Sequence, residues 1–198
     1  MHRNTLALTV LALLQYKPLH PYGIQRLIRR WGKDQVINVG QRASLYRVID
    51  RLQDAGLVQV LETGRDQAYP ERTVYEITDT GRAIARRWLL DMLAEPEQSF
   101  PEFPAALSHL LMLTREEMLD ALNQRQSALA EALDRYDAAL ADQAERGFLR
   151  ITALETEYLR AVTAAEADWV RAVSDDLQSG RLTWSAEALD ALDALAGA

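Results

Sequence analysis

The sequence predicts a mainly α-helical chain with one small β-hairpin, made of two parts that differ in character. Apolar residues recur at helical spacing over most of the 198 residues, and a short segment after residue 56 has the pattern of a strand instead. The charge is also divided. Residues 1–90 hold 14 Lys and Arg against 8 Asp and Glu (net +6), whereas residues 91–198 hold 8 against 21 (net −13). This asymmetry indicates a basic module that meets a polyanion and an acidic module that does not.

The composition is that of a soluble globular protein, with 48% hydrophobic and 26% charged residues. Cys is absent, which fits a reducing compartment, and we expect the protein to be cytoplasmic. The apolar run from Leu6 to Leu14 is far shorter than the roughly 20 residues of a membrane span, and no small-x-small cleavage site follows it. We therefore expect a buried helix there and no membrane partner. The three His residues lie too far apart for a local metal pattern, so we expect no metal or other cofactor.

The basic part begins with three predicted helices. The first covers residues 6–15, and the second covers residues 22–31, where arginines lie off an apolar stripe that includes Trp31. The third covers residues 41–56 and ends at Gly56, a residue type favoured just after a helix. Its apolar positions fall at i, i+3, i+4 and i+7, and they form one narrow stripe of Leu45, Val48, Ile49 and Leu52.

A β-hairpin follows the third helix, with strands at residues 57–61 and 72–77 around a charged tip. Thr78 or Asp79 then caps a fourth helix. Three helices, a hairpin and a further helix are the element order of a winged helix-turn-helix domain. We assign this domain to residues 1–94.

The rest of the chain is predicted to be a separate helical domain. Residues 95–104 carry three of the six prolines and no helical pattern, so we expect a linker there and a second domain over residues 105–198. A capping box at 114–117 opens a long helix that Gly147 breaks. A second long helix is expected over residues 148–177, and a short final one over 182–195.

Two long helices with one apolar stripe expose more than a small domain can bury alone, so we expect a partner or a second copy of the chain to pair with them. The residues we expect at this homodimer interface, or at an effector site beside it, are Leu154, Tyr158, Val162, Trp169 and Val173. For Trp169 and for Trp88 of the fourth helix, packing is one interpretation and the wall of a cavity for a planar apolar effector is the other.

The outward face of the third helix favours double-stranded DNA as the partner. A helix in the major groove reads base edges through residues near its N-terminus, while neighbouring elements hold phosphates. Here the first two turns present Arg42, Ser44, Tyr46 and Arg47, and Arg51 lies at the groove's edge. Arg47 is expected to read a base. The hairpin tip supplies Arg65 and Gln67, which suit a wing on the adjacent minor groove or backbone.

Other functions remain as alternatives. A protein-interaction module that never touches DNA is the second hypothesis, because fold does not fix function. Catalysis has little support. The sequence has no Cys, no Gly-rich phosphate loop, no Gly-x-Ser-x-Gly and no His-Glu-x-x-His, and the acidic residues of the second half read as a solvated helix face. We expect no catalytic residues.

Three segments resemble the PadR family of bacterial transcriptional regulators: His20-Pro-Tyr-Gly-Ile-Gln-Arg-Leu27, Ser44-Leu-Tyr-Arg-Val-Ile-Asp-Arg-Leu-Gln-Asp-Ala-Gly-Leu57 and Thr73-Val-Tyr-Glu-Ile-Thr-Asp-Thr-Gly81. Residues 148–177 look like the helical C-terminal region of the long-tailed branch. The resemblance implies a homodimer whose C-terminal helices cross between subunits, commonly a repressor released by a small molecule. It also implies phosphate contacts by Tyr22, Ser44 and Tyr46, with Gln41 at the helix cap.

Together these observations predict a dimeric regulator on a roughly palindromic operator. Two-fold symmetry would place the two recognition helices about 34–36 Å apart, one turn of DNA.

Overall fold

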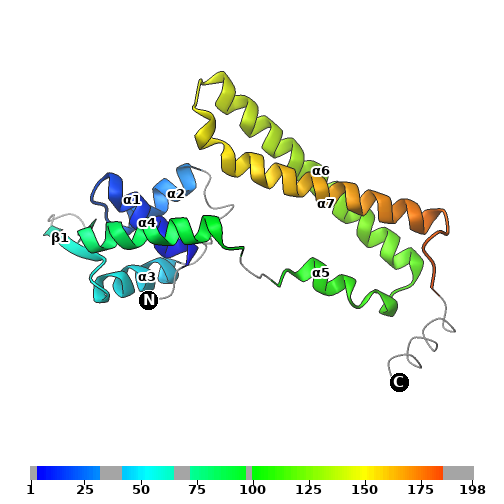
Figure 1. The fold of residues 1–198 in the computed structure, drawn as a ribbon, viewed down its shortest axis with the longest axis horizontal. Helices are drawn as coiled ribbons and strands as arrows, with labels where there is room; N and C mark the ends of the chain where they lie inside the picture. The colour runs from blue at the N-terminus through cyan, green and yellow to red at the C-terminus, as the bar shows by residue number, and fades with distance from the viewer. Residues whose placement is uncertain (1–3, 32–41, 65–71, 97–99, 185–198) are drawn as a thin grey trace. The chain divides into compact units, whose positions relative to one another are not determined.

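The computed structural model describes residues 4–31, 42–64, 72–96 and 100–184. It is mainly helical with one two-stranded antiparallel hairpin, as the sequence predicts, and it divides into two compact units, Met1–Ser99 and Phe100–Ala198 (Figure 1). Most of the final helix expected over 182–195 lies outside the described residues.

Helix α1 (Thr5–Tyr16) forms the centre of the first unit. Asn4 caps it, because its side-chain oxygen accepts the Ala7 N–H at 2.8 Å. The helix is apolar nearly all round and is largely buried, as predicted, with Val10 and Leu11 fully inaccessible to solvent. It packs against α3 and α4 and against the hairpin, so it is the common support for the elements that follow.

Helix α2 (Pro21–Arg30) begins at an unusual cap. The His20 Nδ1 accepts the Gly23 N–H at 2.8 Å, and Pro21 at the first helical position has no N–H to satisfy. Ile24 and Ile28 are buried. The sequence interpretation placed Trp31 on the same apolar stripe, but this residue follows the helix as its C-cap and is exposed, because the helix ends one residue earlier.

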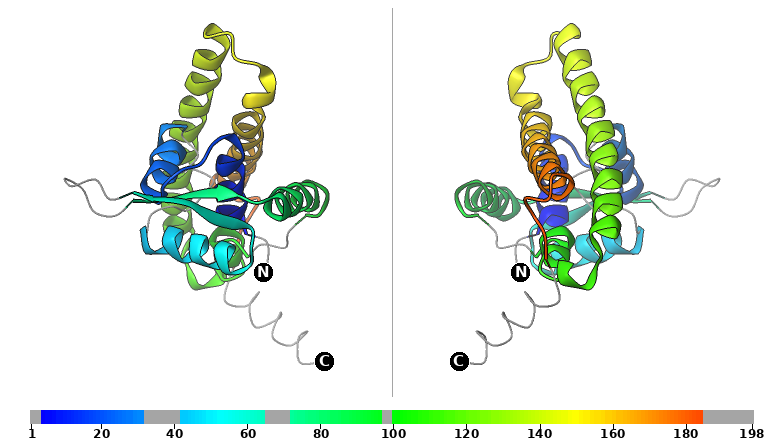
Figure 2. Two further views of the ribbon diagram at one scale, coloured as in Figure 1. Left: turned by 90° about the vertical axis from the view of Figure 1, so that its left-hand side faces the viewer. Right: turned by 90° about the vertical axis from the view of Figure 1, so that its right-hand side faces the viewer.

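Helix α3 (Arg42–Asp54) leads into the hairpin of β1 (Val58–Gly64) and β2 (Arg72–Ile77). Gly56 has a φ of 68°, which turns the chain from the helix into β1. The register pairs Val58 with Ile77, and a β-bulge lies between Val60 and Glu62. Figure 2 shows the hairpin beside α3 and α4 within this unit.

Helix α4 (Asp79–Ala94) starts at Thr78, one of the two caps that the sequence offered. The Thr78 hydroxyl accepts the Gly81 N–H at 3.0 Å and donates to the carbonyl oxygen of Gly56 at 2.8 Å. Trp88 is buried in the core that the three N-terminal helices, the hairpin and α4 share. Its role is therefore packing, and the alternative of an effector cavity around it is wrong.

The second unit consists of α5 (Glu102–Leu107), the 3-10 turn η2 (Leu110–Met112), α6 (Arg115–Glu145), the 3-10 turn η3 (Arg150–Thr152) and α7 (Leu154–Gln178). The expected capping box is present, because Thr114 and Glu117 exchange hydrogen bonds of 2.8 and 3.2 Å. Gly147, with a φ of 69°, ends α6 as predicted. Helices α6 and α7 lie side by side and run antiparallel (Figures 1 and 2).

Two boundaries differ from the prediction. Helix α5 begins at Glu102, inside the stretch 95–104 that was expected to lack helix, because Pro101 acts as its N-cap and Pro104 lies in its first turn, where no helical N–H is needed. Helix α7 begins at Leu154 and not at 148, since residues 150–152 form a 3-10 turn first. None of the helices among the described residues is long and apolar enough to cross a membrane.

The core of the second unit is small for helices of this length. It consists of Met118, Leu122, Val170 and Leu177, with partly buried neighbours that include Phe103 and Val173. Ion pairs of Arg125 with Glu166 and of Arg160 with Asp137 also link α6 to α7. The outer face of α7 is left with exposed apolar side chains.

Candidate nucleic-acid interface

Helix α3 is fixed to the first unit by its predicted stripe. Leu45, Val48, Ile49 and Leu52 are at most 4% exposed, and they pack in the same core as α1 and the start of β1. Burying four such side chains contributes on the order of 1.5–3 kcal/mol each, which makes α3 a rigid element. The opposite face is therefore presented to solvent in one defined orientation.

That face carries polar and charged side chains. Tyr46 is 50% exposed, and Arg47, Asp50 and Arg51 are also exposed, whereas Ser44 is half-buried. Among the residues that the structure describes, neither Arg47 nor Arg51 forms an ion pair with a carboxylate. Both guanidinium charges are thus available to an external anion.

Each guanidinium is held by the helix itself. The Arg47 Nε donates to the carbonyl oxygen of Ala43 at 3.2 Å, and its Nη2 donates to the Ser44 Oγ at 3.3 Å. The Arg51 Nε donates to the carbonyl oxygen of Arg47 at 3.2 Å. These contacts use few of the five N–H donors of each group, so the remaining donors keep a preferred direction.

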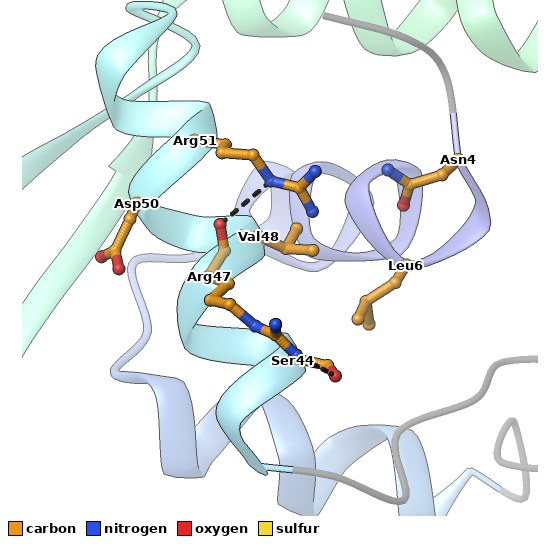
Figure 3. A pocket seen from close by; sticks show the side chains of 7 residues that line it. All are labelled: Asn4, Leu6, Ser44, Arg47, Val48, Asp50 and Arg51. Carbon is orange, nitrogen blue, oxygen red and sulfur yellow. Dashed lines mark hydrogen bonds between the residues drawn. The ribbon is translucent and has the colours of Figure 1, made fainter.

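An open hollow of about 590 Å³ lies between α3 and the start of α1. Its wall is formed by Asn4, Leu6, Ser44, Arg47, Val48, Asp50 and Arg51. In Figure 3 the Arg51 guanidinium extends toward Asn4 and that of Arg47 toward Ser44, while the Asp50 carboxylate points the other way. The hollow therefore has basic and amide groups on its rim and the apolar Leu6 and Val48 beneath them.

Tyr75 lies on β2, where its backbone pairs with Leu19 just before α2 and its side chain packs against the core of the first unit. Burial raises the pKa of the Tyr75 hydroxyl, and the charges of Asp50 and Tyr46 add to this. The hydroxyl therefore stays protonated at neutral pH and can donate a hydrogen bond.

Tyr22 lies at the start of α2 and is 58% exposed. Its ring stacks on the His20 imidazole with 6.0 Å between centroids and 17° between planes. The cap that fixes the first turn of α2 therefore also limits where this phenol can reach.

The structure describes several of the residues that were predicted to contact DNA. Ser44, Tyr46, Arg47 and Arg51 share the solvent-facing side of α3, and Tyr22 lies on α2, which packs against α3. Arg42 opens α3, but its side chain is not among those described. Gln41, Arg65 and Gln67 lie outside the described residues. Sequence reasoning missed Asn4, although an Asn before an apolar helix is a recognisable cap.

The predicted interface residues of the second unit all lie on α7 but differ in exposure. Leu154, Tyr158, Val162 and Trp169 are exposed, with Tyr158 at 68%, whereas Val173 is half-buried against the small core. Trp169 also meets Phe103 edge-on at 5.9 Å between centroids, and the Arg125 guanidinium lies 3.5 Å above the same Phe103 ring. Because a helix turns by about 100° per residue, the five positions share one side of α7. Among the described residues, Val173 on this side packs toward α6, whereas Leu154, Tyr158 and Val162 are left exposed.

A comparison with protein families decides the identity of the first unit. The transcriptional regulator PadR-like family matches residues 10–87, which include α2, α3 and the hairpin. Residues 10–87 form a PadR-like domain. No curated protein matches the sequence.

Solved structures with the same fold cover most of this chain. Bacillus subtilis PadR in complex with operator DNA is 17% identical, with a TM-score of 0.73 over 88% of this chain and 99% of that one. The same protein in complex with p-coumaric acid is 16% identical, with a TM-score of 0.69 over 87% and 98%. The Vibrio cholerae virulence activator AphA is 21% identical, with a TM-score of 0.65 over 88% and 99%. At these identities the likeness establishes the fold.

Proposed function

We propose that this protein is a sequence-specific DNA-binding transcriptional regulator that acts as a homodimer in the cytoplasm. The observation that carries the proposal is the exposed face of α3, where Arg47 and Arg51 have no carboxylate partner among the described residues, within a half of the chain that carries net positive charge. The PadR-like match over residues 10–87 supports it, as does a structural neighbour in complex with operator DNA.

In this proposal residues 1–94 bind DNA and residues 105–198 dimerise, with 95–104 between them. Helix α3 enters the major groove, and Tyr22 and Gln41 contact the backbone beside it. Arg42 extends the basic side of α3 at its N-terminus, and Arg65 and Gln67 form the wing. A protein-docking face would be expected to carry an apolar patch instead, but apart from Ala43 the exposed side chains described on α3 are polar or charged.

DNA binding is tested by fluorescence anisotropy on a duplex from the region upstream of the chain's own gene, over a salt series. Several phosphate contacts per dimer make the affinity fall steeply as salt rises. Arg87→Gln is the matched control, since Arg87 lies on α4, is exposed and pairs with Asp91. The absence of binding at low salt, or an affinity that does not change with salt, would contradict the proposal.

The homodimer is proposed from the outer face of α7. Leu154, Tyr158 and Val162 fall at i, i+4 and i+8 and are exposed, and between them lies Ala161, which lets a second helix approach closely. A second copy of this chain would cover them. Sedimentation velocity should give twice the chain mass for the wild type and for Gln124→Glu, an exposed change on α6. Tyr158→Glu should give the monomer mass, and an unchanged dimer would exclude this face.

For the direction of regulation we propose repression, relieved by a small apolar or aromatic ligand. One structural neighbour is in complex with p-coumaric acid, and another is named a virulence activator. Transcription in vitro from the upstream promoter distinguishes repression from activation. Repression predicts less transcript as protein is added, whereas a rise in transcript would make the protein an activator.

A further inference from the structure

The hollow between α1 and α3 has unused hydrogen-bond donors but few free acceptors. The Asn4 Oδ1 is occupied by the Ala7 N–H, which leaves the side-chain NH₂ of this amide. The Ser44 Oγ accepts from Arg47, so its own hydrogen is left to donate. With the two guanidiniums, four side chains that line the hollow keep hydrogen-bond donors, and the carboxylate of Asp50, which also lines it, is turned away from them (Figure 3).

The chemistry that fits such a rim is an oxyanion. A guanidinium matches a phosphate with two parallel N–H donors, and a neighbouring amide and hydroxyl complete the shell. Leu6 and Val48 under the rim are 9% and 4% exposed, so the floor of the hollow is apolar and offers no competing acceptor. The hollow is open to solvent, as a group that belongs to a continuous strand requires.

We propose that this hollow holds one phosphate of the DNA backbone, so that Arg47 and Arg51 grip the strand and do not read bases. The proposal rests on the proposed function, and it replaces the expectation that Arg47 contacts a base edge. The three side chains Ser44, Arg47 and Arg51 lie at i, i+3 and i+7, on the side of α3 that faces Asn4. They fix the position of the helix along the groove.

The residues that read bases are then those on the other edge of α3. Tyr46 and Asp50 are exposed, and the Asp50 carboxylate points away from the hollow (Figure 3). A carboxylate can accept from the amino group of cytosine, which carries sequence information that a phosphate contact lacks.

The experiment compares Arg47→Gln and Arg51→Gln with the control Arg87→Gln on two duplexes, the upstream region and a shuffled sequence of equal length. Loss of one phosphate contact should weaken binding to both duplexes by the same factor, about fivefold at roughly 0.15 M salt, and lower the salt slope by about one. The control should match the wild type. Circular dichroism melting shows whether each variant is folded.

Two results would overturn the assignment. A loss confined to the upstream duplex would make the arginines base readers, and an unchanged affinity and salt slope would leave the hollow without a phosphate.

If the wild type binds neither duplex, the proposed function fails, and inorganic phosphate then tests the hollow separately. Broadening of the ³¹P resonance by the wild type and Arg87→Gln, lost in Arg47→Gln and Arg51→Gln, would assign the hollow to a free phosphate-bearing ligand. No broadening by the wild type would overturn the oxyanion site itself.

Discussion

The Nδ1 of His20 accepts the backbone N–H of Gly23 at 2.8 Å, so a histidine caps α2, the helix that packs against α3. The cap satisfies one of the N–H groups at the start of α2 that no helical carbonyl can reach.

His20→Ala should therefore destabilise the chain by about 1 kcal/mol, the usual cost of losing an N-cap, as measured by urea unfolding. His20→Asn is the matched control, because Asn is among the best capping residues and restores the acceptor. If both variants lost the same stability, the stacking of His20 on Tyr22 would matter more than the cap.

Adding one methyl group at Gly81 should lower the stability of the fold by more than the loss of the His20 cap. A Cβ at this position would lie 2.1 Å from the carbonyl oxygen of Leu57 and 2.8 Å from the Ile77 Cγ1. The same carbonyl accepts the Thr78 N–H, so moving it breaks a hydrogen bond as well. Gly81→Ala should cost about 3 kcal/mol, the upper end for overpacking, because backbone has to move.

Gly56→Ala provides the comparison. A Cβ there meets nothing within 4 Å, but its φ of 68° is unfavourable for alanine, which costs roughly 1–2 kcal/mol. Urea unfolding should rank Gly81→Ala below Gly56→Ala in stability. The reverse order would mean that the junction of α4 with β1 adjusts easily.

Arg125 joins three helices of the second unit, since it pairs with Glu166 of α7 and lies over the Phe103 ring of α5. Both ionic side chains are partly exposed, so the coupling between them should be modest. A double-mutant cycle of Arg125→Gln and Glu166→Gln should give a coupling energy of about 1 kcal/mol. A value near zero would leave the cation–π contact as the main role of Arg125.

The second unit should also lose stability in acid. Hydrogen bonds from Thr114 lower the pKa of Glu117, and those from Arg160 and Arg150 lower the pKa values of Asp137 and Glu157. A carboxylate whose folded pKa is depressed contributes stability above its ordinary value, which is 4.5 for Glu and 3.8 for Asp, and loses this contribution as pH falls further.

The melting temperature should accordingly not depend on pH around pH 6, and it should decrease as the pH drops below about 4.5. Asp137→Asn should lower the melting temperature at pH 6 but reduce its fall between pH 4 and pH 3, because one titrating carboxylate is gone. A fall as steep as that of the wild type would show that the Arg160 pair does not contribute to stability.

The parts of the fold that the sequence predicted are those set by local pattern. The spacing of Leu45, Val48, Ile49 and Leu52 predicted both α3 and its buried face, because a helix repeats every 3.6 residues. The pattern from Thr114 to Glu117 predicted the capping box that the structure contains. The polar side of α3 followed directly, and with it most of the described residues of the candidate site.

The missed features depend on contacts between distant segments. Leu19 and Tyr75 exchange backbone hydrogen bonds of 3.0 and 2.9 Å, which no local pattern encodes. The hollow is lined by Asn4 and by Arg51, and these two residues come to the same hollow because α1 and α3 share a core. His20 was not expected as a cap, because Ser, Thr, Asp and Asn are the usual ones. The exposure of Leu154, Tyr158 and Val162, in contrast to the half-buried Val173, depends on where α6 lies.

The two hydrogen bonds of the Thr78 hydroxyl link two helices of the first unit. The hydroxyl touches both the carbonyl oxygen of Gly56, after α3, and the N–H of Gly81, inside α4. Thr78 is therefore a direct link between the end of α3 and the first turn of α4, and its β-branched side chain leaves this link little rotational freedom.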